Sequence, residues 1–389
     1  MNLLVKIIIA IGLGIGCGMF FPTWLARIFI TYNAIFSQFL GFLIPLIILG
    51  FVAPAIADVG RKAGLILVVT TAIAYIFTSL SGFYSYFIGQ GLFPGLVKPR
   101  QLAADAAGHE PQPFFTIEMP PLMGVMTALV MAFLLGICMA AINSRSLKHG
   151  LDEFRECIQL TIGRVIIPLL PLYIFGIFLN MTMAGDVACV LGTFAGIIGI
   201  IFAMHICLLI FQYCIAALFV RKNPLRMLLN MMPAYFTALG TQSSAATIPV
   251  TLRQTIKMGV SEEIAGFVVP LCATIHMSGS AMKIVACALA IMIMEGMVYD
   301  VQMFSGFILM LGISIVAAPG VPGGAIMASL GLLASFLGFN ETQQALMIAL
   351  YITMDSFGTA CNVTGDGAIA QIIQHFFGGK RVNVAAPEA

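Results

Sequence analysis

Long apolar runs, separated by short polar breaks, follow one another along nearly the whole chain. A run of about 20 apolar residues is long enough to cross the hydrocarbon core of a bilayer as an α-helix. The alternation of single apolar and polar residues that is typical of a membrane β-barrel does not occur in these runs. The pattern therefore predicts an all-α polytopic membrane protein, and the runs of its first half cover residues 2–22, 34–57, 63–94, 119–143, 157–184 and 187–220.

The runs of the second half differ, because each carries a polar or Gly/Pro-rich interruption near its middle. A helix can break inside a membrane only where protein or water satisfies its backbone groups, and paired broken segments are typical of transporter binding sites. We therefore expect two re-entrant helical hairpins with tips at residues 243–246 and 319–324; two ordinary kinked spans are the alternative. The four interrupted runs are 226–256, 259–299, 302–338 and 341–376.

Composition argues against a soluble protein. Only 9% of the 389 residues are charged and 60% are hydrophobic, whereas soluble domains average about 25% charged residues. A net charge of +2 gives no sign of a nucleic-acid partner. The N-terminal apolar run lacks a clear cleavage site, so we interpret it as a transmembrane helix and not as a signal peptide. The nine cysteines lie singly in apolar runs, which indicates packing and neither a disulfide framework nor a metal site.

The basic residues support the hairpins. With a cytoplasmic N-terminus and two re-entrant hairpins, three basic residues face outward (Arg27, Lys98 and Arg100) and twelve lie in cytoplasmic loops. This is the bias that the positive-inside rule expects, and full spans in place of the hairpins weaken it. The twelve are Lys6, Arg61, Lys62, Arg145, Lys148, Arg221, Lys222, Arg226, Arg253, Lys257, Lys380 and Arg381.

Two acids, Asp355 and Asp366, lie in the last apolar run, and ionisable residues inside a membrane are functional by default. Asn362 and Asp366 are four residues apart and share a helix face, as Asp355, Thr359 and Asn362 do at i, i+4 and i+7. Carboxylate, amide and backbone oxygens suit Na⁺. The structural alternative is that a neighbouring hydroxyl or Lys283 satisfies Asp366, and that a local serine satisfies Asp355.

The two expected hairpin tips suit an anionic group. Ser243 and Ser244 would place hydroxyls and the backbone N–H groups of a half-helix N-terminus next to a carboxylate. The second tip would close over a ligand with backbone groups, since glycine permits close approach. A plain turn is the alternative for either tip alone. The second-tip residues that we expect at the substrate are Pro319, Gly320, Val321, Pro322 and Gly323.

Four motifs in the second half resemble the glutamate/aspartate transporter family, also called the dicarboxylate/amino acid:cation symporters. They occur in the family's order: TQSSAATIPVTLR, ATIHMSGSA, PGVPGGAIM and DSFGTACNVTGD. The first half resembles the family more loosely, through IPLIILGFVAPAIADVG and LVVTTAIA. The resemblance implies eight transmembrane helices, two re-entrant hairpins, inverted repeats, an elevator-type movement and a homotrimer in the cell (inner) membrane.

The resemblance also divides the chain into a scaffold and a transport domain. Scaffold helices one and two would occupy residues 1–60, and scaffold helices four and five residues 118–184. Helix three, at 61–95, would join the transport domain at 187–376, which holds helix six, the first hairpin, helix seven, the second hairpin and helix eight. Residues 377–389 would form a cytoplasmic tail.

Residue roles follow from the same resemblance. Asp355 would pair the α-ammonium of an amino acid, which needs a buried partner. Gln242, Gly358, Thr359 and Asn362 would complete the substrate site. Sodium would bind Asp366 and Asn362 together with groups of helix seven, and a further sodium would use Ser278 with helix three. The remaining candidate sodium ligands are Thr70, Thr71, Cys272, Thr274, His276, Met277 and Ser278.

The sequence departs from the family at the positions that bind a second carboxylate. Gly358 and Gln242 stand where acidic-amino-acid members carry an arginine, and a buried carboxylate without a partner is costly. We therefore predict a neutral amino acid, small and polar such as serine, threonine or alanine, or larger such as glutamine because Gly358 leaves space. The alternative is a C4-dicarboxylate or an acidic amino acid recognised by Gln242 or Lys283.

A second departure concerns the coupling ion. The family motif Asn-Met-Asp-Gly-Thr is replaced by residues 276–280, His-Met-Ser-Gly-Ser, so a neutral serine stands in one sodium site. Our hypothesis is that Lys283 or His276, at i and i+7, substitutes for that sodium. Proton coupling through His276 is the alternative to sodium. We expect no enzyme, because no nucleophile–base pair or zinc spacing occurs in the sequence, and no channel, because the polar residues form no continuous path.

Overall fold

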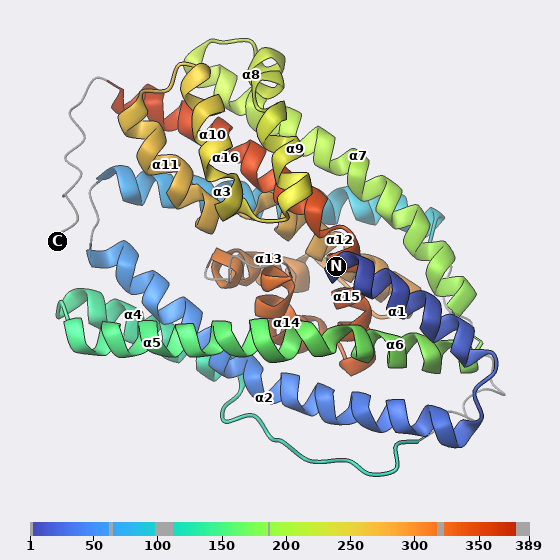
Figure 1. Cartoon of the computed structure of the whole chain (residues 1–389). Helices are drawn as coiled ribbons and strands as arrows, with labels where there is room; N and C mark the ends of the chain where they lie inside the picture. Colours follow the sequence, from blue (N-terminus) through green and yellow to red (C-terminus); the bar gives the residue numbers. More distant parts are fainter. Residues whose placement is uncertain (1–2, 62–64, 98–111, 186, 317–322, 379–389) are drawn as a thin grey trace.

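The computed structural model describes residues 3–61, 65–97, 112–185, 187–316 and 323–378, and these residues form helices and loops without a strand (Figure 1). The all-α prediction is therefore confirmed for the described residues. The helices are α1 Leu3–Gly18, α2 Thr23–Arg61, α3 Leu65–Leu92, α4 Val125–Ala141, α5 Arg145–Thr161, α6 Ile167–Met183, α7 Val187–Val220, α8 Pro224–Asn230, α9 Met232–Thr241, α10 Ser244–Lys257, α11 Glu262–Ile275, α12 Ser278–Met294, α13 Val301–Val316, α14 Gly324–Leu337, α15 Glu341–Thr353 and α16 Asp355–Phe377.

Five helical stretches of the described chain are long and apolar enough to cross a membrane, and the bent pair α15 and α16 makes a sixth. Two of the five join neighbouring elements, since α5 runs on into α6 and α11 runs on into α12. The apolar helices α1 and α4 are shorter, with 16 and 17 residues. Counting these two with the six gives eight, which is the number that the sequence predicts. The number of true spans stays a prediction.

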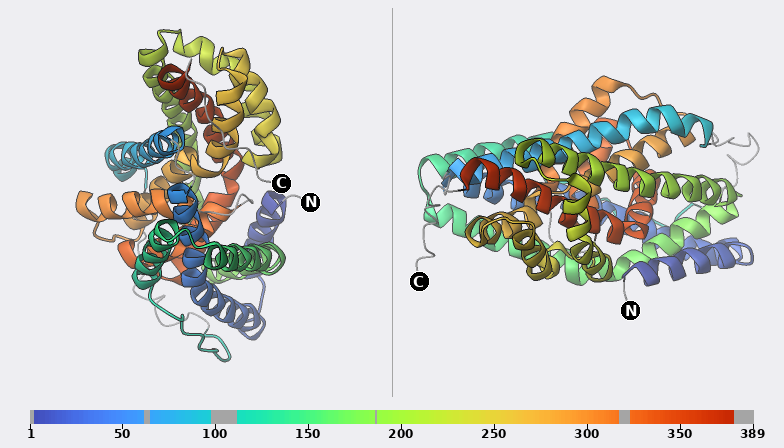
Figure 2. Two further views of the ribbon diagram at one scale, coloured as in Figure 1. Left: turned by 90° about the vertical axis from the view of Figure 1, so that its left-hand side faces the viewer. Right: turned by 90° about the horizontal axis from the view of Figure 1, so that it is seen from above.

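The helices pack in two groups, with three helices between them (Figure 1). In one group α2 contacts α4, α5 and α6, and α1 contacts α6. In the other, α16 is in contact with α3, α7, α9, α10, α11 and α12. Helices α13, α14 and α15 touch both groups, and the views of Figure 2 show the same arrangement. The first group consists of expected scaffold helices and the second of expected transport-domain helices, whereas α13, α14 and α15, also expected in the transport domain, touch both; the division into two domains stays a prediction.

Helices α12 and α16 lie at the centre of the molecule. Nearly all side chains of α12, and those of α16 up to Ile373, are buried on every side. A helix that is buried all round belongs to a core and not to a lipid-facing surface. Both helices begin at a break: α12 follows the break at His276 and Met277, and α16 follows a bend of 62° after α15. One polar interruption thus coincides with a break, and the other begins directly after a bend; protein covers both.

Two pairs of short helices correspond to the expected hairpins. Helices α9 and α10 pack on each other and on α16, and α13 packs on α14. They have 10, 14, 16 and 14 residues. At about 1.5 Å per residue, none reaches across the roughly 30 Å of a hydrocarbon core. Their lengths favour re-entrant hairpins over kinked full spans.

The helix ends agree with the distribution of basic residues. The C-terminal ends of α2 and α16 and the N-terminal end of α5 lie at the same end of the molecule, on the left of Figure 1, and both figures show this (Figures 1 and 2). These are the ends that the positive-inside rule assigns to the cytoplasm.

Candidate substrate and cation site

A pocket opens where the α9–α10 tip, the α11–α12 break and the α15–α16 bend meet. It holds about 370 Å³ of space, its open mouth included. Broken helices expose backbone groups at such a meeting point, which is how transporter sites are built. The lining residues are Gln242, Ser243, Ser244, Ala273, Met277, Ser280, Ala325, Tyr351, Asp355, Thr359 and Asn362.

The α9–α10 tip presents a helix N-terminus to the pocket. Gln242 ends α9 in the left-handed conformation, with φ at 54°, and reverses the chain. Ser243 then caps α10, because its hydroxyl accepts the N–H of Ala246 at 3.2 Å. The positive end of the α10 dipole therefore points toward the pocket, as the sequence predicts for a carboxylate-binding tip.

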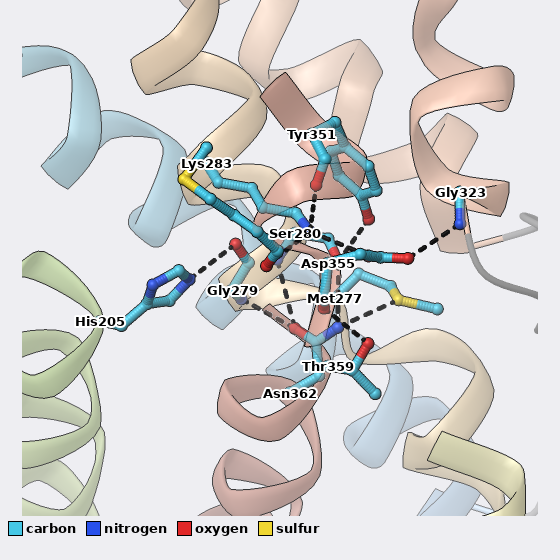
Figure 3. A network of polar contacts seen from close by, with 11 residues as sticks. His205, Met277, Gly279, Ser280, Lys283, Gly323, Tyr351, Asp355, Thr359 and Asn362 are labelled. Atoms are coloured by element: carbon cyan, nitrogen blue, oxygen red, sulfur yellow. Dashed lines mark hydrogen bonds and ion pairs between the residues drawn. The ribbon is translucent and has the colours of Figure 1, made fainter. Parts of the chain in front are cut away.

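The predicted face of helix eight is confirmed as one face of α16. Asp355, Thr359 and Asn362 all line the pocket. The Asn362 amide oxygen accepts the N–H groups of Gly279 at 2.8 Å and Ser280 at 3.4 Å, and so caps the N-terminus of α12 (Figure 3). The same amide donates to the Ser280 hydroxyl at 3.1 Å. Asn362 thus holds α12 against α16 at the pocket wall.

Asp355 has two partners that the sequence pattern does not pair with it. Its Oδ1 lies 2.9 Å from the Lys283 ammonium, and its Oδ2 accepts the Gly323 N–H at 2.9 Å (Figure 3). Gly323 precedes α14, so the second hairpin is tied to the acid of α16. The carboxylate is 5% exposed and the lysine 0%. A buried ion pair such as this one needs further hydrogen bonds to persist.

The space beside Gly358 is filled, which corrects the expectation that it is free for a larger substrate. A Cβ built on Gly358 would lie 2.8 Å from Lys283 Nζ and 2.9 Å from its Cε. The lysine side chain crosses α16 at this glycine, and any other residue there would press on it. A substrate with a large side chain, such as glutamine, therefore finds no free space beside Gly358.

Asp366 also has a basic partner. Its Oδ1 lies 2.9 Å from His276 Nδ1, and that nitrogen is 3.2 Å from the Asn362 carbonyl. The expectation that His276 and Lys283 share one face at i and i+7 is wrong, because the helix breaks between them. His276 caps α11 while Lys283 belongs to α12, and each contacts a different acid. Asp366 is not among the residues that line the pocket.

Helix α3 reaches the break through other hydroxyls than the expected ones. Thr78 accepts the Met277 N–H at 3.2 Å, and Ser81 donates to the Ser278 carbonyl at 2.7 Å. Thr70 instead donates to Ile66 in its own helix, and Thr71 Oγ1 has no partner among the described residues. The structure does not bring the expected threonines to Ser278, and their role as sodium ligands stays a prediction.

The remaining expected ligands are spread around the break. Met277 lines the pocket, and Cys272 is buried with its carbonyl bound to the His276 N–H at 2.9 Å. The side chain of Thr274 is exposed, and its hydroxyl donates to Leu271. Residues Pro319, Gly320, Val321 and Pro322 lie outside the described residues, so the expectation for them stays a prediction.

Sequence reasoning missed the contribution of helix α7. The Gln212 amide donates to the Ser278 hydroxyl at 3.0 Å, and His205 lies 3.3 Å from the Gly279 carbonyl. Both are isolated polar residues in the apolar run 187–220, which is a signal that sequence could have offered. Tyr351 and Ser280 were missed too; the tyrosine hydroxyl donates to the serine at 3.1 Å.

The surroundings of Asp366 offer oxygen to a cation. The Gln212 amide oxygen is buried without a partner among the described residues. The Gln212 oxygen and the His276 ring both lie over Gly365, next to Asp366. Unpaired buried oxygens are costly unless a donor or an ion satisfies them. Their chemistry suits a hard monovalent cation such as Na⁺.

Comparison with known proteins agrees with this geometry. Residues 3–376 match the model of the family described as "Sodium:dicarboxylate symporter family". The chain belongs to this family. This family is one of transporters, which supports the expectation that the protein is not an enzyme. Membership also makes it an integral membrane protein, in agreement with its apolar helices.

Individual relatives carry different substrates in their names. Human excitatory amino acid transporter 2 is 33% identical over 156 residues, which are 40% of this chain and 27% of that protein. Rat neutral amino acid transporter B(0) is 30% identical over 172 residues, 44% of this chain and 31% of that protein. The serine/threonine transporter SstT of Acinetobacter baumannii is 26% identical over 384 residues, 94% of each chain. The similarity to the first two therefore spans about a third of their length or less.

Proposed function

We propose that this protein is a sodium-coupled symporter that carries a small neutral amino acid, such as serine, threonine or alanine. The observation that supports it most is the charge of the pocket. Among the described residues, Asp355 is the charged side chain that lines the pocket, and the Lys283 ammonium lies 2.9 Å from it. The net charge of the pair is zero.

A neutral pair favours a ligand that is itself neutral. A zwitterionic amino acid adds one positive and one negative group, so no net charge enters the low-dielectric site. A dicarboxylate would bring two negative charges to a lysine that already has a partner, and unpaired buried charge is strongly unfavourable. The substrate ammonium would share the Asp355 carboxylate, which has about four acceptor positions.

The substrate carboxylate would bind at the α10 N-terminus. Ser243 and Ser244 lie there, and the helix dipole favours an anion. The hydroxyls of Ser280, Tyr351 and Thr359 line the remaining wall and suit a small polar side chain. The neutral transporter B(0) and the serine/threonine transporter, by their names, accord with this choice.

The coupling ion in this proposal is Na⁺ at Asp366. Asn362 and the unpaired oxygen of Gln212 lie near that acid. His276 occupies one oxygen of Asp366, so Na⁺ has to compete with the imidazole for it. A proton carried by His276 is the second candidate for the coupling ion, and the same contact supports it.

The movement in this proposal is that of an elevator. The group around α16 would slide against the group around α2, within a homotrimer in the inner membrane. The two-group packing supports this division, and the short α13 and α14 would serve as the outer gate.

A thermal-shift screen tests the substrate and the ion together. Purified protein is heated with each of the twenty amino acids and with C4-dicarboxylates, in Na⁺ and in choline. We expect serine, threonine or alanine to raise the melting temperature only in Na⁺, because ligand that binds the native state stabilises it. Stabilisation by succinate or glutamate alone would reject the neutral substrate.

A dicarboxylate or acidic amino acid is the second candidate function. The observation in its favour is the Lys283 ammonium beside Gly358, the position where acidic-amino-acid members of the family carry an arginine. The close pairing of this ammonium with Asp355 weighs against it, because a second carboxylate would have to displace the first.

A further inference from the structure

The Lys283 ammonium is satisfied entirely by protein groups. It donates to Asp355 Oδ1 at 2.9 Å and to the carbonyls of Tyr351 and Met354 at 3.4 Å each. It also lies 3.4 Å from the centre of the Tyr351 ring, within reach of a cation–π interaction. The two carbonyls belong to the C-terminal end of α15, where the helix dipole favours a cation. Protein groups at the α15–α16 bend therefore form a complete binding site for the Lys283 ammonium (Figure 3).

The glycine at position 358 makes this position of the Lys283 side chain possible. A Cβ at position 358 would come within 2.8 Å of Nζ, 2.9 Å of Cε and 3.3 Å of Cδ. The lysine can reach Asp355 across α16 because this residue has no side chain. Lys283 and Gly358, of which the glycine departs from the family pattern, thus form one structural unit.

The acid in this unit is also the acid that faces the pocket. Asp355 lines the pocket, and its second oxygen accepts the N–H of Gly323 at the start of α14. A carboxylate that loses its only counter-charge in a membrane protein pays a large desolvation cost. An amino acid can supply that counter-charge only while it is bound. Lys283 supplies it at all times.

We propose that Lys283 is a tethered counter-cation, which keeps Asp355 neutralised after the amino acid has left and so lets the substrate-free carrier return across the membrane. The inference rests on the proposed function, because it assumes that the protein carries an amino acid. With the lysine present the site has zero net charge both with and without a zwitterion. The protein should therefore perform net uptake, and no exported cation or exchanged amino acid has to fill the site.

The test separates net uptake from exchange. Full-length protein is reconstituted into liposomes, and uptake of radiolabelled L-serine is measured in two modes. In the first, the lumen holds no amino acid and Na⁺ is directed inward. In the second, the lumen holds unlabelled L-serine and Na⁺ is equal on both sides. Exchange avoids the return of the substrate-free carrier, whereas net uptake requires it in every cycle.

We expect Lys283→Met to keep exchange within about threefold of the wild type and to lose net uptake by about tenfold or more, because its substrate-free carrier holds an unpaired carboxylate. Gly358→Ala should change the ratio in the same direction, since its methyl group displaces the ammonium while the lysine remains. Lys257→Met, at an exposed lysine of α10, is the matched control and should leave both modes unchanged.

Each outcome decides something. A Lys283→Met protein whose net uptake falls no further than its exchange overturns the inference, whether both modes persist or both are lost. If this variant does not fold, Gly358→Ala decides by the same ratio. Wild-type protein that moves no serine in either mode, with a folded melting transition, overturns the proposed function and the inference with it. Active wild type with an unchanged ratio in both variants overturns the inference alone.

Discussion

Asp355 and Asp366 lie on the same helix, each beside a basic side chain at 2.9 Å, yet their surroundings differ. Asp355 lines the pocket, and its other oxygen is held by the backbone of the second hairpin. Asp366 is buried where α7, α11 and α16 meet, near the Gln212 oxygen, which has no partner among the residues that the structure describes. The first acid faces a pocket, whereas the second is enclosed by protein. Lysine lies beside the first acid and histidine beside the second, so a ligand meets a different protein partner at each site.

The largest effect is expected from Asp355→Asn, which removes the acid of the pocket and leaves Lys283 buried without a counter-charge. Breaking a buried pair in this way costs about 3–5 kcal/mol of folding free energy. Serine should no longer shift the melting temperature, and uptake should fall by about a hundredfold or more. Adding Lys283→Met to Asp355→Asn should restore stability but not serine binding. A double variant as unstable as the single one would show that the two residues do not act as a pair.

Asp366→Asn should abolish coupling and spare the pocket. The variant keeps the shape of the side chain but loses the charge that holds Na⁺. We expect serine binding to become independent of Na⁺ and weaker by about tenfold or more, as calorimetry can measure in Na⁺ and in choline. Asp300→Asn, at an exposed acid, is the control and should behave as wild type. Serine binding that still rises with Na⁺ in Asp366→Asn would place the coupling ion elsewhere.

His276→Gln should strengthen Na⁺ binding if imidazole and ion compete for the same oxygen. A hydrogen bond to a charged group contributes about 1.5–3 kcal/mol net, so its removal should tighten Na⁺ about tenfold. The measurement is the Na⁺ concentration that gives half of the maximal serine uptake. The exposed His149 offers a matched control in His149→Gln. Weaker Na⁺ binding in His276→Gln would make the imidazole a supporting ligand and not a competitor.

Ser243→Ala should have the smallest effect. It removes the cap of α10, which costs about 1 kcal/mol of stability, and a hydroxyl from the pocket, which should weaken serine binding several-fold. Ser261→Ala removes a similar cap from α11, away from the pocket. The control should show the loss of stability without the loss of affinity. Equal affinities in the two variants would exclude the Ser243 hydroxyl from substrate binding.

The two acids also show which features of the site can be predicted from the sequence. Spacing along one helix predicts that Asp355, Thr359 and Asn362 share a face, because the α-helical period fixes it. The polar interruptions predict breaks inside two apolar runs, and the structure breaks at His276 and bends at Met354, directly before the second interruption. The shared face and the breaks each depend on a single segment of the chain, and the structure shows them.

The partners of the acids could not be predicted in the same way. Lys283 and Asp355 are separated by 72 residues, and His276 and Asp366 by 90. Their pairing depends on how α11 and α12 pack on α16, which no local pattern encodes. The same reason explains why α3 offers Thr78 and Ser81 to the break in place of Thr70 and Thr71: the register between two distant helices decides it.

The most direct measurement is a structure of the full-length protein in a membrane mimic with L-serine and Na⁺ bound. Our account expects the serine ammonium within hydrogen-bonding distance of Asp355, its carboxylate at the N-terminus of α10, and a sodium ion on Asp366. A ligand whose carboxylate pairs with Lys283 while Asp355 makes no contact with it, or a ligand outside this pocket, would contradict the account.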